Sequence, residues 1–174
     1  KVATHAWELE RRSQRVRALR ERQTKLRREE RGGLPVLRIA HELMVIHDRT
    51  LYRTAGDQTF FDWVQRVHGI GEVQARKYLR VAERLESSEV RGLHVGVEVQ
   101  AFLADQEQPV RRALIQALRE GHEDALEIAA RSGAVWLSQF YPPEEVTWRT
   151  LAVAAGELMR ADIEAAGYDY IGGW

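Results

Sequence analysis

The sequence predicts an all-α protein with a helix-turn-helix at its centre. Apolar residues recur at spacings of three and four over about three quarters of the chain, well above the helical share of an average protein. Glycines and prolines fall at the ends of these stretches, for example at Gly32-Gly33 and at Gly121. A chain of 174 residues and 20.0 kDa is long enough to bury a real core in one or two small domains.

Residues 1–31 are predicted to form one long, protruding basic helix, because neither Pro nor Gly occurs before Gly32. A coiled-coil-like apolar stripe runs along it, interrupted by His5 and Arg12. The stripe and its adjoining seam consist of Val2, Leu9, Val16, Leu19, Gln23 and Leu26. Such a stripe suits pairing with another chain or docking on the body of the protein. A solvated helix with one apolar edge is the third alternative.

Two further helices lead into the centre of the chain. The first, LPVLRIAHELMVIHDRTLYRTAG, has Pro35 in its first turn, where a missing N–H costs nothing. Its apolar face consists of Leu37, Ala40, Leu43, Met44 and His47. The second, DQTFFDWVQRVHG, has Thr59 as the expected N-terminal cap. Its apolar face consists of Phe60, Trp63, Val64 and Val67.

The stretch TFFDWVQRVHGIGEVQARKYLRVAERL carries the functional hypothesis. A helix-turn-helix needs two helices and a tight turn, and Gly69 can take the positive φ that such a turn requires. Ile70 is the expected apolar plug, and the inward face of the second helix consists of Ala75, Tyr78, Leu79 and Ala82. The opposite face consists of Glu72, Val73, Arg76, Lys77, Arg80 and Arg84. Its cations can reach DNA phosphates, and Arg76 or Lys77 can contact guanine edges.

The run DRTLYRTAGDQTFFDWVQRVHGIGEVQARKYLRVAERL resembles a helix-turn-helix segment common in plasmid and phage proteins, in which an "LYR" element and a "TF..W/Y" helix precede the turn. GIGEVQARKYLRVAE is also similar to the central DNA-binding domain of ParB- and KorB-type partition proteins, and the likeness extends over about residues 46–131. The resemblance implies that Glu72, Val73, Arg76, Lys77 and Arg80 face bases and phosphates. Gly71 departs from it by replacing the usual Ser or Thr cap. The arginine-rich nucleotide-binding motif of ParB proteins is missing, so no CTP-dependent clamp is expected.

A competing local resemblance is the helix-hairpin-helix, to whose turn Gly69, Ile70, Gly71 and Ala75 conform. That motif would imply sequence-independent contact with the DNA backbone. An ordinary helical turn without a DNA role is the remaining alternative. The preceding LYR and TFFDW elements favour the helix-turn-helix.

The rest of the chain is predicted to be an acidic helical part. Alternation of Leu93, Val95, Val97 and Val99 suggests a short strand, as in a wing. Pro109 opens a helix that ends near Arg119, and further helices are expected at residues 122–133 and 144–166. The predicted domains are therefore the basic helix 1–31, the helix-turn-helix domain 34–104 and the acidic domain 105–174. The aromatic tail, with Tyr168, Tyr170 and Trp174, is a possible docking segment for a partner chain.

The 26 basic and 26 acidic residues cancel over the whole chain but are unevenly distributed. Residues 1–31 hold 11 Lys or Arg against 5 Asp or Glu, residues 34–92 hold 9 against 8, and residues 93–174 hold 6 against 13. A neutral total therefore does not exclude a polyanionic partner. The cations expected to give the first helix salt-dependent phosphate affinity are Arg11, Arg12, Arg15, Arg17, Arg20, Arg22, Arg27 and Arg28.

Other function classes find little support. His41-Glu42 begins like a zinc-protease HExxH motif, but the next histidine, His47, falls six residues on and off the same helical face. A phosphate-binding glycine loop and a nucleophile elbow are missing, so we expect neither an enzyme nor a cofactor. The absence of Cys and of a membrane-spanning apolar run fits a cytoplasmic, nucleoid-associated protein. The expected partner is double-stranded DNA, bound by a homodimer. The alternative is a helical adaptor whose basic helices bind protein.

Overall fold

A computed structural model describes residues 2–25, 33–122, 125–126, 142, 144–147, 149–150 and 152–153. Every regular element within these residues is helical, so the all-α prediction is confirmed for them. The chain divides into two compact units, residues 1–104 and residues 105–174. In the part of the chain that the structure describes, no helix combines the length and apolar character needed to cross a membrane.

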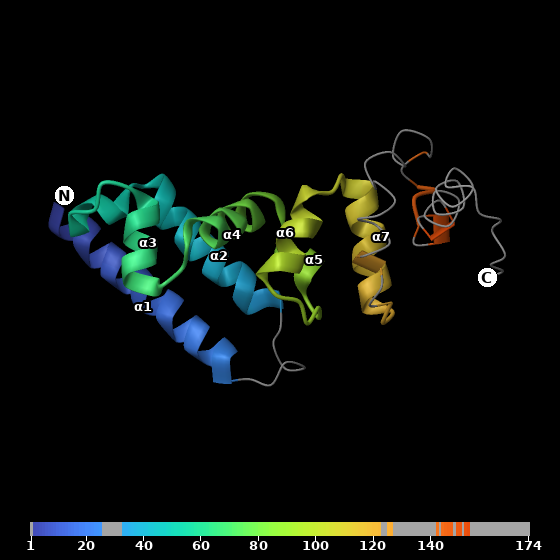
Figure 1. The fold of residues 1–174 in the computed structure, drawn as a ribbon, viewed down its shortest axis with the longest axis horizontal. Helices are drawn as coiled ribbons and strands as arrows, with labels where there is room; N and C mark the ends of the chain where they lie inside the picture. The colour runs from blue at the N-terminus through green and yellow to red at the C-terminus, as the bar shows by residue number, and fades with distance from the viewer. Residues whose placement is uncertain are drawn as a thin grey trace, which may run out of the picture. The chain divides into compact units, whose positions relative to one another are not determined.

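Helix α2 (Gly33–Asp48) is the centre of the first unit (Figure 1). Helix α1 (Val2–Lys25) and helix α4 (Glu72–Arg84) both pack extensively on it. Apolar residues at helical spacing give α2 its buried face. That face consists of Val36, Leu37, Ile39, Ala40, Leu43 and Ile46. The neighbours of α2 are therefore held at fixed positions by one shared core.

Helix α1 docks on the body of the protein and does not protrude, which corrects that part of the prediction. Leu9, Ser13 and Val16 are buried on α1, which packs against α2 and the 3₁₀ helix η2 (Leu51–Ala55). Leu9 and Val16 belong to the apolar stripe, whose members are seven positions apart, and Ser13 lies between them in the sequence. Of the three alternatives for the stripe, docking on the body is therefore the one that this structure contains. Residues 26–31 of the predicted helix lie outside the described residues.

Gly33 is the first residue of α2, whereas the sequence suggested that it ends the preceding helix. Its N–H donates to the carbonyl of Leu93 at 2.6 Å. A Cβ at this position would lie 3.0 Å from the carbonyl oxygen of Val90. The glycine therefore permits a close backbone approach between the start of α2 and the segment before α6 (Val97–Asp105).

Helix α3 (Phe60–His68), the turn and α4 form as predicted from local chemistry. The Thr59 hydroxyl accepts the Asp62 N–H at 3.1 Å, so the predicted cap is confirmed. Gly69 has φ 63°, and Ile70 behind it is fully buried. Gly71 precedes α4 in an extended conformation and offers no side chain to cap it. The two helices thus meet at a turn held by one glycine and one apolar plug.

The inward face of α4 differs in detail from the prediction. Ala75 and Tyr78 are buried, whereas Leu79 and Ala82 are half-buried. Val81, which was not expected to face inward, is fully buried. The predicted face was centred too far round the helix, because the extensive packing of α2 on α4 is a tertiary contact that helical periodicity alone does not place.

The strand predicted over Leu93–Val99 is wrong. Residues 93–96 form an irregular connection, and Val97 begins helix α6. The short helix α5 (Ser87–Val90) precedes that connection and follows α4, which ends at Arg84. The residues buried along α6 follow a helical spacing and not an alternating one. They are Val97, Gln100, Ala101, Leu103 and Ala104.

The described portion of the second unit is mainly helix α7 (Gln108–Arg119), with Pro109 in its first turn as expected. Its buried face consists of Val110, Ala113, Leu114, Ile115 and Ala117. Gly121, with φ 87°, follows its end. The helices predicted at 122–133 and 144–166 fall mostly outside the described residues, and the aromatic tail does so entirely.

Candidate nucleic-acid interface

The face of α4 turned away from the core carries the residues predicted to contact DNA. Glu72, Val73, Arg76 and Arg84 are exposed, and Lys77 and Arg80 are partly exposed. Helix packing explains the division, because Ala75, Tyr78 and Val81 are the residues that α4 buries in the core. All six predicted α4 residues therefore reach solvent on one helix.

Arg76 is held by two neighbours. Its Nε and Nη2 donate to the same carboxylate oxygen of Glu72, at 2.9 Å and 2.6 Å. Its guanidinium carbon lies 4.5 Å from the centroid of the Phe61 ring, a cation–π distance. The side chain of Arg76 remains 59% exposed. Its guanidinium is therefore ordered although it stands at the surface.

The other cations of α4 have different surroundings. Lys77 forms an ion pair with Glu98 of α6. Arg84 lies 3.8 Å from Glu83. A surface hollow between α2 and α4 is lined by Met44, His47, Asp48, Arg76, Leu79, Arg80, Glu83 and Arg84. Three arginines thus line this hollow, and Asp48 and Glu83 are the acidic residues that line it.

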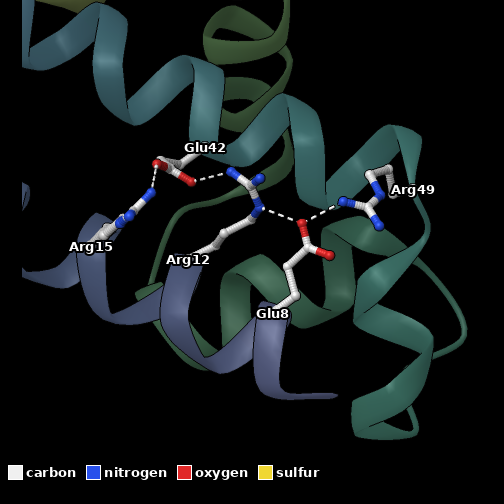
Figure 2. Close-up of polar contacts among 5 residues, drawn as sticks. All are labelled: Glu8, Arg12, Arg15, Glu42 and Arg49. Atoms are coloured by element: carbon white, nitrogen blue, oxygen red, sulfur yellow. Dashed lines mark hydrogen bonds and ion pairs between the residues drawn. The ribbon is translucent and has the colours of Figure 1, made fainter. Parts of the chain in front are cut away.

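Helix α1 uses its arginines differently, as Figure 2 shows. Arg12 lies between two carboxylates and donates to Glu42 at 2.6 Å and to Glu8 at 3.1 Å. Arg15 reaches the other oxygen of Glu42 at 3.1 Å, and Arg49 pairs with Glu8. Five charged side chains from α1, α2 and the residue after α2 form one network. Arg12 and Arg15 therefore contribute to the docking of α1, a role that the sequence pattern did not indicate.

The electrostatics of this network favour the charged forms of Arg12 and Glu8. Partial burial lowers the pKa of Arg12, but hydrogen bonds to Glu42 and Glu8 outweigh it and raise that pKa above its ordinary value. Burial would likewise raise the pKa of Glu8, yet the hydrogen bond from Arg12 and the positive charges of Arg49, Arg12 and Arg11 leave it lowered. With only 17% of its side chain exposed, Arg12 is poorly placed to meet a DNA phosphate.

The remaining arginines of α1 are distributed around the helix. Arg20 donates to the backbone carbonyl of His68 at the end of α3, and the guanidinium of Arg11 lies 5.0 Å from the ring of Trp7. Arg17 and Arg22 are exposed. Arg27 and Arg28 lie outside the described residues. Of the eight predicted phosphate ligands in the N-terminal segment, Arg12, Arg15 and Arg20 bond to the body of the protein.

His68 is buried where α1 meets α3. Its Nε2 lies 3.2 Å from the Ser13 hydroxyl, and its ring packs edge-on against Trp63 at 5.1 Å. Among the described residues its Nδ1 has no hydrogen-bond partner. Burial, followed by the charges of Arg17 and Arg20, lowers the pKa of His68 from 6.5 to about 4. A neutral imidazole therefore belongs to the docked state of α1.

Sequence reasoning missed two contributions to this surface. Phe61 escaped notice because Phe60, its neighbour, satisfies the apolar face of α3. The face formed by Phe60, Trp63, Val64 and Val67 centres near Phe60, and Phe61 lies about 100° round the helix from that centre, which is a usable signal that its ring lies off the face. Met44 and His47 were predicted to be core residues, but they are only half-buried and line the hollow beside α4.

The described residues contain no group of three or more His, Asp or Glu that could hold a metal ion. Glu42, next to His41 in the abbreviated HExxH pattern, instead binds Arg12 and Arg15. Comparison of the chain with protein-family models, with curated proteins and with solved structures finds no match.

Proposed function

We propose that this protein binds double-stranded DNA through α3 and α4, with the outer face of α4 in the major groove. The observation that carries the proposal is the α4 face itself, which exposes cations on a short helix behind a tight Gly69–Ile70 turn. A major groove about 12 Å wide admits one α-helix, and a helix-turn-helix presents its second helix to that groove.

The α4 residues divide into two roles. Arg76 and Lys77, in the first half of the helix, contact base edges, because the N-terminal part of a recognition helix enters the groove. Arg80 and Arg84 line the hollow beside α2, and their charge attracts the DNA backbone. Exposed Arg11, Arg17 and Arg22 on α1 add salt-dependent affinity that does not depend on base sequence.

A homodimer would place two α4 helices on half-sites about one DNA turn, roughly 34 Å, apart. Together with the resemblance to plasmid and phage proteins, this arrangement suggests partition, replication control or transcriptional regulation on the nucleoid. A light-scattering mass of the full chain, alone and with a selected duplex, tests the dimer.

The decisive experiment replaces Arg76, Lys77 and Arg80 together by Ala. Sequence-specific binding to a duplex selected from a random library should fall by more than about 100-fold at moderate salt, since each good base contact contributes about 1–3 kcal/mol. The slope of log K against log salt should become shallower by about one for each phosphate that the variant no longer neutralises. Fluorescence anisotropy over a salt series measures both quantities.

A matched control removes the same formal charge elsewhere, by replacing Arg91, Arg112 and Arg119 with Ala. This control should retain specific binding within a few-fold. Equal losses of affinity in the two variants would contradict a groove-binding α4, and a selected duplex without sequence preference would instead favour the helix-hairpin-helix alternative. Circular dichroism is used to check that both variants are folded.

A helical adaptor is the second candidate, and the ion-pair network of α1 favours it. Arg12 and Arg15 are satisfied by carboxylates of the protein, so the basic segment is less available to DNA than its composition implies. A second hollow, between α1 and α2, is lined by Arg15, Ala18, Leu19, Arg22, Arg38, His41 and Glu42. An adaptor would bind no DNA duplex at physiological salt. It would instead self-associate or bind another protein through α1 and α2.

A further inference from the structure

Val73 is the most exposed of the large apolar side chains in the described part of the chain, with 71% of its surface in contact with solvent. It lies in the first turn of α4, next to Glu72 and nearly one helical turn before Arg76. Trp7, another exposed apolar residue, is partly covered by the guanidinium of Arg11. Val73 therefore presents two methyl groups outward at the very end of α4 that a helix-turn-helix inserts into DNA.

The orientation of Arg76 is restrained from two directions. Glu72 accepts from Nε and Nη2, and the Phe61 ring lies against the guanidinium. A guanidinium has five N–H groups in a rigid plane, so the two bonds to Glu72 occupy one edge of that plane. One N–H of Nη1 and the second N–H of Nη2 then form the end edge of the guanidinium, which can donate two parallel hydrogen bonds. Holding this geometry before binding reduces the entropic cost of forming the contact.

The spacing of Val73 and Arg76 is close to that of neighbouring base pairs. Three residues advance about 4.5 Å along a helix and rotate to within roughly 60° of the same direction. Successive base pairs are about 3.4 Å apart along the duplex. Both side chains can therefore contact adjacent base pairs in one groove.

We propose that Phe61, Glu72, Val73 and Arg76, the recognition patch, identify a thymine next to a guanine. Val73 packs on the 5-methyl group of thymine, the only methyl group that the four bases present in the major groove. Arg76 donates to O6 and N7 of guanine, the pair of acceptors that suits an arginine fork. Phe61 and Glu72 are positioning residues for Arg76. This inference rests on the proposed function, because it requires α4 to enter the groove.

The test begins with duplexes selected from a random library by the full wild-type chain. Replacing the implicated thymine by uracil removes only the 5-methyl group and should weaken binding about fourfold, the effect of one buried methyl group. Replacing the guanine by 7-deazaguanine removes N7 and should weaken binding roughly tenfold. Inosine in place of that guanine lacks the 2-amino group but keeps O6 and N7 in the major groove, so it serves as the control, with affinity nearly unchanged.

Protein variants connect each base to its residue. Val73→Ala should bind the thymine and uracil duplexes equally well. Phe61→Leu should reduce the preference for guanine at one position roughly tenfold, while affinity for random duplex and its salt dependence remain as in the wild type. Phe61→Tyr retains the ring and should restore the preference. A purely structural role for Phe61 would instead change the melting temperature without changing which base is preferred.

The outcomes separate the two proposals. If no duplex is enriched at physiological salt, DNA binding itself is wrong. Suppose instead that a duplex is bound specifically, but that Val73→Ala keeps the wild-type sensitivity to uracil or Phe61→Leu keeps the guanine preference. The role of the recognition patch is then wrong, although DNA binding through α4 is not. Loss of the sensitivity to uracil in Val73→Ala, together with loss of the guanine preference in Phe61→Leu, supports the proposed role of the recognition patch.

Discussion

Helices α1 and α4 both carry several arginines, yet Arg12 and Arg20 of α1 bond to the body of the protein whereas Arg76 of α4 stands at the surface. In α1, Arg12 is sandwiched between Glu8 and Glu42, and Arg20 bonds to a backbone carbonyl of α3. In α4, Arg76 forms its ion pair with Glu72 of the same helix and stands 59% exposed. The difference arises because α2 offers the Glu42 carboxylate to α1, whereas the carboxylate that meets Arg76 comes from α4 itself. Charge counted along a sequence is thus a poor measure of charge available to a partner.

Lowering the pH should have the largest effect on stability, because it acts on His68, which is buried against the docked helix α1. His68 has a pKa of about 4 in the folded protein, below the ordinary 6.5 that it regains on unfolding. Between these two values the unfolded chain binds the proton more readily, so stability is complete above about pH 6.5 and declines as the pH falls towards 4. The full loss amounts to about 3 kcal/mol in the free energy of unfolding. Urea denaturation at a series of pH values measures it.

His68→Gln is the control for the acid experiment, because glutamine keeps a polar group beside Ser13 but cannot titrate. Its stability should depend less steeply on pH between 6.5 and 4 than that of the wild type. Identical curves for the two proteins would show that the acid sensitivity arises elsewhere, for example in carboxylates such as Glu8, whose pKa is lowered.

Glu42→Ala should have the next largest effect. The carboxylate is only 16% exposed and binds both Arg12 and Arg15. Its removal leaves the mostly buried Arg12 with one partner fewer, which should cost about 2 kcal/mol of stability. Thermal and urea denaturation measure the loss. Glu10→Ala, a change at an exposed position of α1, should cost much less, and equal costs would contradict the importance of the network.

Glu72→Ala, the counterpart on α4, should change stability least. The Glu72–Arg76 pair joins residues four apart on one helix with both side chains more than half exposed. Pairs of this kind contribute about 0.3–0.5 kcal/mol. A loss comparable to that of Glu42→Ala in the same denaturation assay would erase the contrast between the two helices.

The elements predicted well from the sequence are those that local chemistry determines. Thr59 as a cap, Gly69 at positive φ and Ile70 as a buried plug depend on short-range hydrogen bonds and backbone sterics, which a few residues encode. The residues exposed on the outer face of α4 could likewise be predicted, because they follow from the helical periodicity of the sequence.

The errors concern features that depend on distant residues. Leu93–Val99 alternates like a strand, yet Val97 starts a helix because Gln100, Ala101 and Leu103 continue a helical core pattern. The partners of Arg12 could not be inferred, since Glu42 lies thirty positions away and meets it only once α1 has docked. The contact of Phe61 with Arg76 likewise joins two helices. Tertiary context decided each case.

Gly33 limits which residues the start of α2 can accept. Any side chain there would crowd the backbone around Val90 and Leu93, and backbone has no alternative rotamer to adopt. A Cβ at Gly33 would require the carbonyl groups of Val90 and Leu93 to move by a few tenths of an ångström, so a substitution there acts on the joint between α2 and the segment before α6. Conservation of Gly33 among relatives of this protein would therefore reflect a steric requirement of the fold.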